Sequence, residues 1–327
     1  MINSKSRMNM IIMILIMILS VIMVQPGTAE AAGYIDTDTP VSLTLSCQAD
    51  MGPITGQSYD LYLVATTDRY GELTVTDQFK SFNIDIFGEN DEAWRTLAST
   101  LEGYVLLETE KGNIKPAGSG ITDSSGMLTF PAAGQETLSQ GLYLVVGHYH
   151  EQYGYYYDTT PFMVKLPTLD SEKNVWEYIV TSNTKQETGI AASPNYVSRK
   201  AIKVWNDKGY EKSRPKEVTV KLLCDGIVYD TVKLNAANNW SHTWEKLDGD
   251  CKWNVIEEFD GDYKVEITKE GISFVIKNTC GDNGNLPGGK GNSKLPQTGV
   301  LWWPVPVMSA AGLTLIGIGL LRRKSRP

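Results

Sequence analysis

Apolar and polar residues alternate along much of the first part of the chain, as expected for strands that bury one face. The clearest alternating segments are Val41–Leu45, Tyr59–Leu63, Gly141–Val145 and Phe162–Val164. One segment has helical spacing instead: from about Asp91 to Leu107, the residues Trp94, Leu97, Leu101 and Val105 share one face. The pattern predicts a β-sandwich domain over residues 32–185 with one inserted helix.

The second part of the chain alternates in shorter segments. Turn signals such as Asp225-Gly226, Asp248-Gly249 and Glu270-Gly271 separate them. The predicted strands are Ala201–Trp205, Val218–Cys224, Ile227–Leu234, Trp240–Trp244, Trp253–Glu257, Tyr263–Thr268 and Ile272–Asn278. Seven short strands in about 80 residues predict a second, smaller β-sandwich over residues 200–280.

These patterns together predict an all-β chain with two tandem immunoglobulin-like sandwich domains. Polar residues and turn formers between the domains predict a linker over residues 186–199. Residues 281–294, rich in Gly, Asn and Lys, are expected to form a flexible spacer.

The N-terminal segment has the pattern of a secretory signal peptide. Lys5 and Arg7 precede an apolar run from Met10 to Val24, and Ala29-Glu30-Ala31 follows. Small residues at that spacing are what a signal peptidase reads. We expect residues 1–31 to be removed by cleavage after Ala31. The alternative is an uncleaved N-terminal anchor, although the run is short for a membrane span.

The C-terminal segment has the pattern of a membrane span. Val300 to Leu321 is apolar except for Ser309 and Thr314. The basic residues Arg322, Arg323, Lys324 and Arg326 follow it, and Trp302 and Trp303 stand near its outer edge. Such a distribution predicts a transmembrane helix whose basic end stays in the cytoplasm.

Leu295-Pro296-Gln297-Thr298-Gly299 stands directly before this span. The order LPxTG, apolar helix and positive tail resembles the cell-wall sorting signal of Gram-positive surface proteins. The resemblance implies that a sortase cuts between Thr298 and Gly299 and that Thr298 becomes the acyl donor. Residues 295–327 would then hold the chain in the membrane until it is joined to peptidoglycan or to a sister subunit.

Residues in the second domain resemble a Cna B-type domain. The matching segments are Lys203-Val204-Trp205-Asn206-Asp207, Arg214-Pro215, Val218-x-Val220-x-Leu222, Asn239-Trp240, Trp253-x-Val255-x-Glu257 and Phe274-x-Ile276-x-Asn278. Such domains commonly lock themselves with an isopeptide bond between a lysine and an asparagine. The match implies Lys203 and Asn278 as the cross-linked pair and Glu257 as the catalytic acid.

Strand alternation is consistent with that assignment. Each of the three residues ends a row of apolar side chains on one face: Ala201, Lys203 and Trp205; Trp253, Val255 and Glu257; Phe274, Ile276 and Asn278. A buried lysine is pushed toward its neutral, nucleophilic form and a buried glutamate toward its protonated form. The alternative is a surface ion pair of Lys203 with Glu257, with Asn278 merely ending a strand. If the strand bulges, Glu258 would point inward instead.

The segment Trp176-x-x-x-Val180-x-x-x-x-Lys185 resembles the pilin motif WxxxVxVYPK. The resemblance implies that Lys185 is the acceptor to which another subunit's threonine is joined. Ser182, Asn183 and Thr184 stand where the motif has Val, Tyr and Pro. The alternative is an exposed lysine in the linker. The first domain as a whole resembles the first domain of Gram-positive pilin and adhesin subunits.

A self-formed isopeptide bond is not expected in the first domain, because no lysine occurs between Tyr34 and Phe79. His148 and His150 have no third ligand placed with them, so we expect no metal site. The surrounding tyrosines, Tyr149, Tyr153, Tyr155, Tyr156 and Tyr157, predict a hairpin with aromatic faces and are the first candidates for contact with a host ligand or a neighbouring subunit.

Four cysteines are too few and too scattered for a disulfide framework: Cys47, Cys224, Cys251 and Cys280. Export permits a bridge, for which Cys224 and Cys251 are the first pair to test; the alternative is four independent small apolar residues. The net charge of -8 and the lack of a basic stripe exclude nucleic acid as an expected partner.

No nucleophile elbow, zinc-protease or phosphate-loop motif occurs, so we expect neither an enzyme nor a cofactor. Two functions remain. One is a pilus subunit or wall-anchored stalk whose partners are a sortase, peptidoglycan and sister pilin subunits. The other is a monomeric adhesin that binds a host surface ligand through its first domain.

Overall fold

The alternating segments form strands in the computed structural model, which describes residues 33–82, 86, 90–191, 196–258 and 263–279. The predicted signal peptide, spacer, sorting motif and membrane span lie outside the described residues. Within the described part, no helix is both long and apolar enough to cross a membrane.

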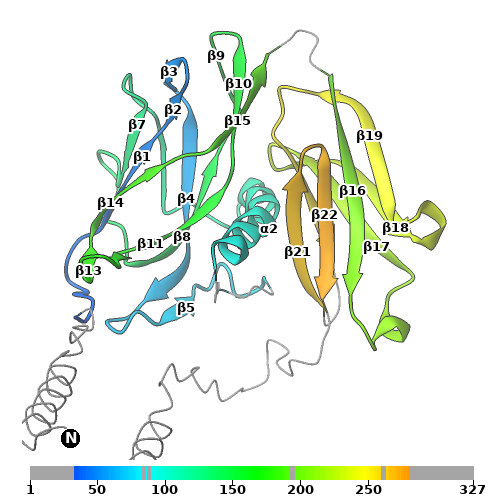
Figure 1. Cartoon of the computed structure of the whole chain (residues 1–327), viewed down its shortest axis with the longest axis horizontal. Coiled ribbons are helices and arrows are strands. Elements are labelled where there is room, and N and C mark those ends of the chain that lie inside the picture. The colour runs from blue at the N-terminus through cyan, green and yellow to red at the C-terminus, as the bar shows by residue number, and fades with distance from the viewer. Residues whose placement is uncertain (1–32, 83–85, 87–89, 192–195, 259–262, 280–327) are drawn as a thin grey trace, which may run out of the picture. The chain divides into compact units, whose positions relative to one another are not determined.

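The first half of the chain is layered around β8, Gly141–Gly147 (Figure 1). This strand lies inside a sheet with the order β11-β8-β4-β5, and β6 pairs with the other part of β4. On one side lies a sheet with the order β14-β1-β7, in which β1 runs parallel to β14. The bounds are β1 Ser42–Ser46, β4 Ser58–Thr67, β5 Leu73–Val75, β6 Gly118–Ile121, β7 Met127–Phe130, β11 Phe162–Leu166 and β14 Ile179–Asn183.

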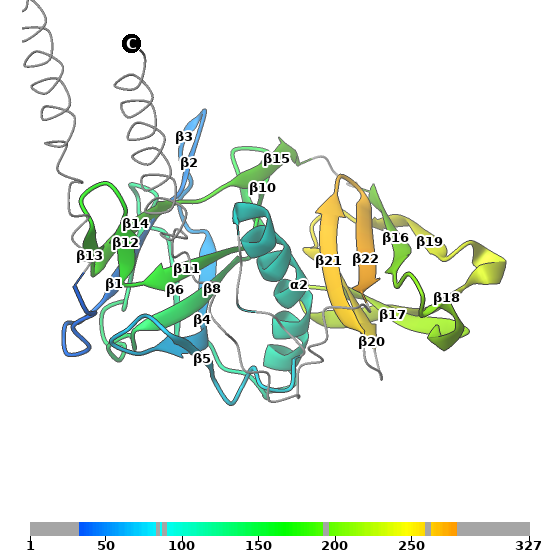
Figure 2. The same cartoon turned by 60° about the horizontal axis from the view of Figure 1, so that its bottom comes forward.

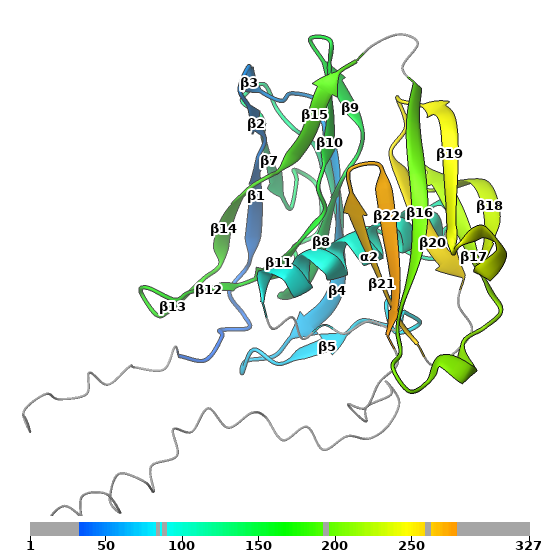
Figure 3. The same ribbon diagram turned by 45° about the vertical axis from the view of Figure 1, so that its right-hand side comes forward.

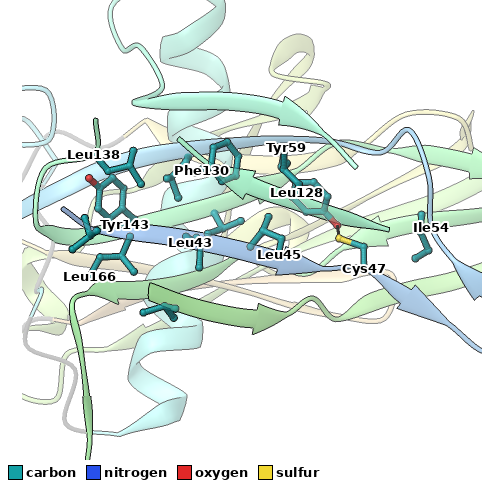
Figure 4. Packing of buried hydrophobic residues seen from close by; sticks show 14 of the residues in the cluster. Leu43, Leu45, Cys47, Ile54, Tyr59, Leu128, Phe130, Leu138, Tyr143 and Leu166 are labelled. Atoms are coloured by element: carbon teal, nitrogen blue, oxygen red, sulfur yellow. Dashed lines mark hydrogen bonds between the residues drawn. The ribbon is translucent and has the colours of Figure 1, made fainter. Parts of the chain in front are cut away.

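All seven residues of β8 are buried because both of its faces are covered. Tyr143 and Val145 point into the core shared with β1 and β7, which Figure 4 shows around Leu43 and Leu45. Their neighbours Leu144 and Val146 join a second core. The continuous apolar run of β8 follows from this double burial.

Helix α2, Asp91–Glu110, covers the second core and confirms the predicted helix. Asn90 caps it by accepting a hydrogen bond from the backbone nitrogen of Ala93 at 3.0 Å. Leu97 and Leu101 pack into the second core as expected. A further face of the helix is also buried, against β20 and β21 of the second half (Figure 3).

The second half is the predicted small sandwich of seven strands (Figure 2). One sheet has the order β19-β16-β22-β21 and the other the order β18-β17-β20. The bounds are β16 Tyr196–Asn206, β17 Glu217–Cys224, β18 Ile227–Asn235, β19 Ser241–Asp248, β20 Trp253–Glu258, β21 Lys264–Glu270 and β22 Ser273–Thr279, with short 3-10 helices at Glu211–Ser213 and Ala236–Asn238. The first and last strands, β16 and β22, pair in parallel.

The segment expected to be a linker, residues 186–199, is largely strand. β15, Gln186–Ile190, pairs with β10, Tyr155–Thr159, and β16 already begins at Tyr196. β15 was not predicted because its side chains are mostly polar. It lies at the edge of a small sheet with the order β15-β10-β9, where most of its residues face solvent. The remaining short strands are β2 Gln48–Ala49, β3 Gly52–Pro53, β9 His150–Gln152, β12 Thr168–Asp170 and β13 Val175–Glu177.

Candidate functional site

Three strands bring Lys203, Glu257 and Asn278 together inside the second sandwich. Lys203 lies on β16 and Asn278 on the adjacent β22, where the parallel register pairs Trp205 with Asn278. Glu257 lies on β20 of the facing sheet, paired with Val220. The three residues retain 5%, 1% and 0% of their exposed area, respectively. The interpretation of Lys203 and Glu257 as a surface ion pair is therefore wrong.

The polar atoms of this triad are in contact. Lys203 Nζ lies 3.2 Å from Glu257 Oε2, and both side chains are fully excluded from solvent. Asn278 Nδ2 donates a hydrogen bond of 2.7 Å to Glu257 Oε1. Asn278 Oδ1 is buried and has no hydrogen-bond partner among the described residues. Glu257 thus lies between the amine and the carboxamide.

Burial dominates the electrostatics of the pair. It lowers the pKa of Lys203 to about 8, against the opposing effect of the Glu257 charge. It also raises the pKa of Glu257, although Lys203 and Asn278 favour the charged form. Both shifts move the pair toward a neutral amine and a neutral acid. The neutral amine has the lone pair that a nucleophile needs.

Aromatic side chains close the site. The ring centre of Trp205 lies 4.4 Å from Lys203 Nζ. Trp240 and Tyr263 pack edge-on against that indole, with ring centres 5.3 and 5.2 Å away. The stack keeps water from the amine, so the low polarity that shifts both pKa values persists.

Glu258, the alternative inward acid, faces away from the site. Its side chain is 51% exposed and pairs with Lys221 on the neighbouring strand. The pairing of β20 with β17 continues through this region without a bulge. Glu257 is therefore the inward residue.

A residue outside the sandwich also reaches the site. The Tyr104 hydroxyl, on α2, donates to the backbone oxygen of Glu257 at 2.8 Å and accepts from its backbone nitrogen at 3.3 Å. Sequence reasoning missed Tyr104, because its contact depends on how the helix packs and not on any spacing along the chain.

Lys185 lies between β14 and β15 and is exposed. Its backbone oxygen accepts a hydrogen bond of 2.9 Å from Thr160, which fixes the chain at this point. Trp176, the first residue of the predicted motif, lies on β13 and donates from its indole nitrogen to Gly33 at 2.6 Å.

The two histidines differ in their surroundings within the described residues. His148 Nε2 lies 2.8 Å from Asp60 Oδ2, whereas His150 lies on β9. The predicted tyrosine hairpin is present, formed by β9 and β10. Tyr149 stacks on Tyr156, and Tyr153 at the turn is 76% exposed.

Cys224 and Cys251 form a disulfide with a Cα–Cα separation of 5.5 Å. They join the end of β17 to the residues just before β20. Among the described residues, the one group spaced for a metal ion is these two cysteines with Asp225, and the disulfide occupies both sulfurs. Cys47 is buried and unpaired.

The arrangement can form an amide bond. A neutral Lys203 can attack the Asn278 carboxamide carbon, while a protonated Glu257 donates to the amide oxygen after the carboxamide rotates to present it. The Nζ–Cγ bond forms, a proton of the amine passes through Glu257 to Nδ2, the Cγ–Nδ2 bond breaks, and ammonia leaves. Contact inside a packed core supplies the proximity that an unactivated amide otherwise lacks.

Comparison with known proteins places the second half in a family. Residues 199–279 match the Cna protein B-type domain, which confirms the expectation for 200–280. A collagen adhesin of Staphylococcus aureus is 34% identical over 134 residues, which are 37% of this chain and 11% of that protein. The chain thus matches only a small part of the length of this curated relative.

Among the solved structures similar to this chain is one B repeat unit of the collagen-binding protein of Staphylococcus aureus. It is 16% identical, the match covers 74% of this chain and 97% of that one, and the TM-score is 0.25. The major pilin SpaD of Corynebacterium diphtheriae is 14% identical, covering 75% and 65%, with a TM-score of 0.28. The basal pilin SpaE of Lactobacillus rhamnosus GG is 11% identical, covering 70% and 84%, with a TM-score of 0.29. The family match therefore rests on residues 199–279, which carry a Cna B-type domain on a mostly β chain.

Proposed function

We propose that this chain is a structural surface protein of a Gram-positive cell, locked by a Lys203–Asn278 isopeptide bond and joined covalently to the cell wall or a pilus. The observation that carries the proposal is the buried contact of Lys203, Glu257 and Asn278. A covalent link between the first and last strands of a domain suits a protein under tension, because those strands pair in parallel and would otherwise separate under load.

Attachment rests on the sorting motif Leu295 to Gly299. The proposed sortase cuts after Thr298 and transfers its acyl group to peptidoglycan or to a lysine of a sister subunit. In the bacterial cell that makes the protein, an enzyme that digests peptidoglycan should release the chain from the wall. Thr298→Ala should leave the chain in the membrane fraction instead. Ser293→Ala, five residues earlier, is the matched control. A wild-type chain absent from the wall digest would contradict attachment.

Polymerisation rests on Lys185, whose side chain is exposed at a fixed point of the backbone. A pilus subunit should give a ladder of high-mass species that withstands boiling, and Lys185→Ala should remove the ladder. Lys208→Ala, another exposed lysine, should leave it intact. A single band in the wild type would favour a monomeric anchored protein.

The second candidate is a wall-anchored adhesin. Similarity to a collagen adhesin and the exposed Tyr153 at the β9–β10 turn favour it. Binding of immobilised collagen by the purified chain, lost in Tyr153→Ser, would support this function. A single band with no such binding would leave a stalk as the remaining function.

A further inference from the structure

Cys47 and Gln186 belong to one polar cluster of the first half, separate from the Lys203 site, because both contact Tyr59 and Thr184. Cys47 follows β1, and Gln186 begins β15. Strands β1 and β14 run in parallel, and the backbone nitrogen of Thr184 donates to Ser46 just beyond their paired residues. This pairing fixes the two chain segments side by side. Figure 4 shows the sulfur of Cys47 against the hydroxyl of Tyr59.

Two hydroxyl groups contact both side chains. The Tyr59 hydroxyl lies 3.3 Å from Cys47 Sγ and 3.0 Å from Gln186 Nε2. The Thr184 hydroxyl accepts from Gln186 Nε2 at 2.8 Å and also hydrogen-bonds the thiol. The thiol and the carboxamide therefore share the same two hydroxyl partners.

The directions of the hydrogen bonds are determined by how many protons each group has. Thr159 donates its one hydroxyl proton to Gln186 Oε1 at 2.8 Å. In its 3.1 Å contact with Thr159, Tyr59 must then be the donor. Tyr59 consequently accepts from the Cys47 thiol. A continuous chain of donors runs from the thiol through Tyr59 and Thr159 to the carbonyl oxygen of Gln186.

Four residues of the cluster are almost completely buried, and one of its acceptors has no hydrogen-bond partner among the described residues. Cys47, Gln57 and Tyr59 are fully buried, and Thr159 is 1% exposed. Gln57 donates to Thr159 at 2.7 Å, while its own Oε1 has no hydrogen-bond partner among the described residues. An unsatisfied buried acceptor is costly unless a donor visits it.

We propose that Cys47 and Gln186 form an internal thioester, which a primary amine such as a lysine side chain can open. The sulfur attacks Gln186 Cδ, and the thiol proton passes to the Tyr59 hydroxyl. Tyr59 passes its own proton to Thr159, and Thr159 passes its proton to the carbonyl oxygen of Gln186. The S–Cδ bond forms. That proton then returns through Thr159 and Tyr59 to Nε2, the Cδ–Nε2 bond breaks, and ammonia leaves.

No oxidant or reductant is needed, because one amide and one thiol become one thioester and one ammonia. Burial raises the pKa of the Cys47 thiol, and it raises that of Tyr59 to about 12, so the thiol keeps its proton until the sulfur attacks. The hydroxyl relay removes that proton during the attack. The fixed neighbourhood of the two groups supplies the proximity.

Opening by an amine reverses the same path. The amine attacks the thioester carbon and becomes joined to Gln186 as an amide, and the Cys47 thiol is regenerated. Gln186 is half-buried, whereas Cys47 is fully buried, so an amine would approach from the Gln186 side.

Methylamine is the probe, applied to the purified full chain. We expect the untreated chain, unfolded without reductant, to show no alkylatable thiol at Cys47. After methylamine, Cys47 should become alkylatable and the peptide containing Gln186 should carry methylamine in place of ammonia, a gain of about 14 Da over the unmodified peptide. Neither change should occur in Cys47→Ala or Gln186→Leu. The Lys203–Asn278 amide does not react with methylamine, so the two cross-links are tested separately.

Gln48→Leu, next to Cys47 and exposed, is the matched control and should react like the wild type. Tyr59→Phe keeps the buried ring but removes the relay, and it should form the thioester at least about tenfold more slowly. The wild type alone decides the proposal. If Cys47 is alkylated in the untreated, unfolded chain and no methylamine is incorporated, the cluster is an inert hydrogen-bond network and the proposal is wrong.

Discussion

The hydroxyl of Tyr104 holds both backbone polar groups of Glu257, donating to the oxygen at 2.8 Å and accepting from the nitrogen at 3.3 Å. β20 is the last strand of its sheet, so these groups have no strand partner on that side. A side chain of α2 thus completes the edge at the residue that is the proposed acid. Through Tyr104, helix α2 of the first half contacts Glu257 in the second half.

Tyr104→Phe should weaken this connection while preserving ring packing. Loss of the hydroxyl leaves the buried backbone groups of Glu257 unsatisfied, which costs about 1–3 kcal/mol. We expect a lower midpoint of chemical unfolding and slower formation of the Lys203–Asn278 bond, measured by mass against time after refolding. Tyr210→Phe is an exposed control. Equal stability and equal rate in both variants would show that the contact with Glu257 has no effect.

Lys252 is the centre of a buried ion cluster between the two halves. Its ammonium lies 2.9 Å from Glu102 on α2 and 2.8 Å from Asp158 on β10, and it is 3% exposed. Lys252→Met retains the side-chain volume but removes the ammonium group from Glu102 and Asp158. We therefore expect a loss of about 3–5 kcal/mol in the free energy of unfolding. Urea unfolding measures this loss. Lys208→Met, at an exposed site, should change it little.

The same cluster should make stability depend on acid pH. Burial opposes ionisation of Asp158, but the ammonium groups of Lys252 and Lys269 hold its pKa well below the usual value of 3.8. A carboxyl group with a lowered folded pKa stabilises the fold above its unfolded pKa, and that stability is lost as the pH falls further. The melting temperature should therefore drop below about pH 4, and less steeply in Asp158→Asn. Identical acid-side slopes would contradict the role of Asp158.

The disulfide gives a redox-dependent prediction. Cys224 and Cys251 are 27 residues apart, and closing a loop of that length stabilises a fold by about 3–4 kcal/mol through the unfolded chain. Reductant should lower the unfolding midpoint of the wild type. The double variant Cys224→Ala and Cys251→Ala should start lower and be insensitive to reductant. A wild type equally indifferent to reductant would show that the bridge adds no stability.

The resemblance to a Cna B-type domain nominated Lys203, Glu257 and Asn278, and strand alternation was consistent with their inward orientation. A period of two residues determines the face of a strand before any tertiary contact is known. The second buried face of α2 could not be predicted this way. Thr100, Gly103 and Tyr104 form no apolar stripe. Thr100 and Gly103 are buried, and Tyr104 is partly buried, because β20 and β21 lie against this side of the helix.

Gly103 illustrates this tertiary requirement. A side chain there would place its Cβ 3.0 Å from both the Val255 oxygen and the Ile256 side chain, so the closeness of the helix to β20 depends on a glycine. The shared contacts of Cys47 and Gln186 with Tyr59 and Thr184 could not be predicted from the sequence either. The residues are far apart in sequence, and the neutral polar groups around them have no recognisable spacing.

The Lys203–Asn278 bond can be read directly from the mass of the methylamine-treated, reduced chain, compared between the wild type and Glu257→Gln. Methylamine and reductant remove the other two cross-links from the comparison. The reference is the mass calculated from the sequence with reduced cysteines and with methylamine in place of ammonia at Gln186. If Lys203 and Asn278 are joined, the wild type should be lighter than this reference by one ammonia, about 17 Da. Digestion should then yield one joined peptide that contains both residues. Glu257→Gln should lack the loss. A wild type at its full mass, with Lys203 and Asn278 in separate peptides, would show that the isopeptide bond does not form.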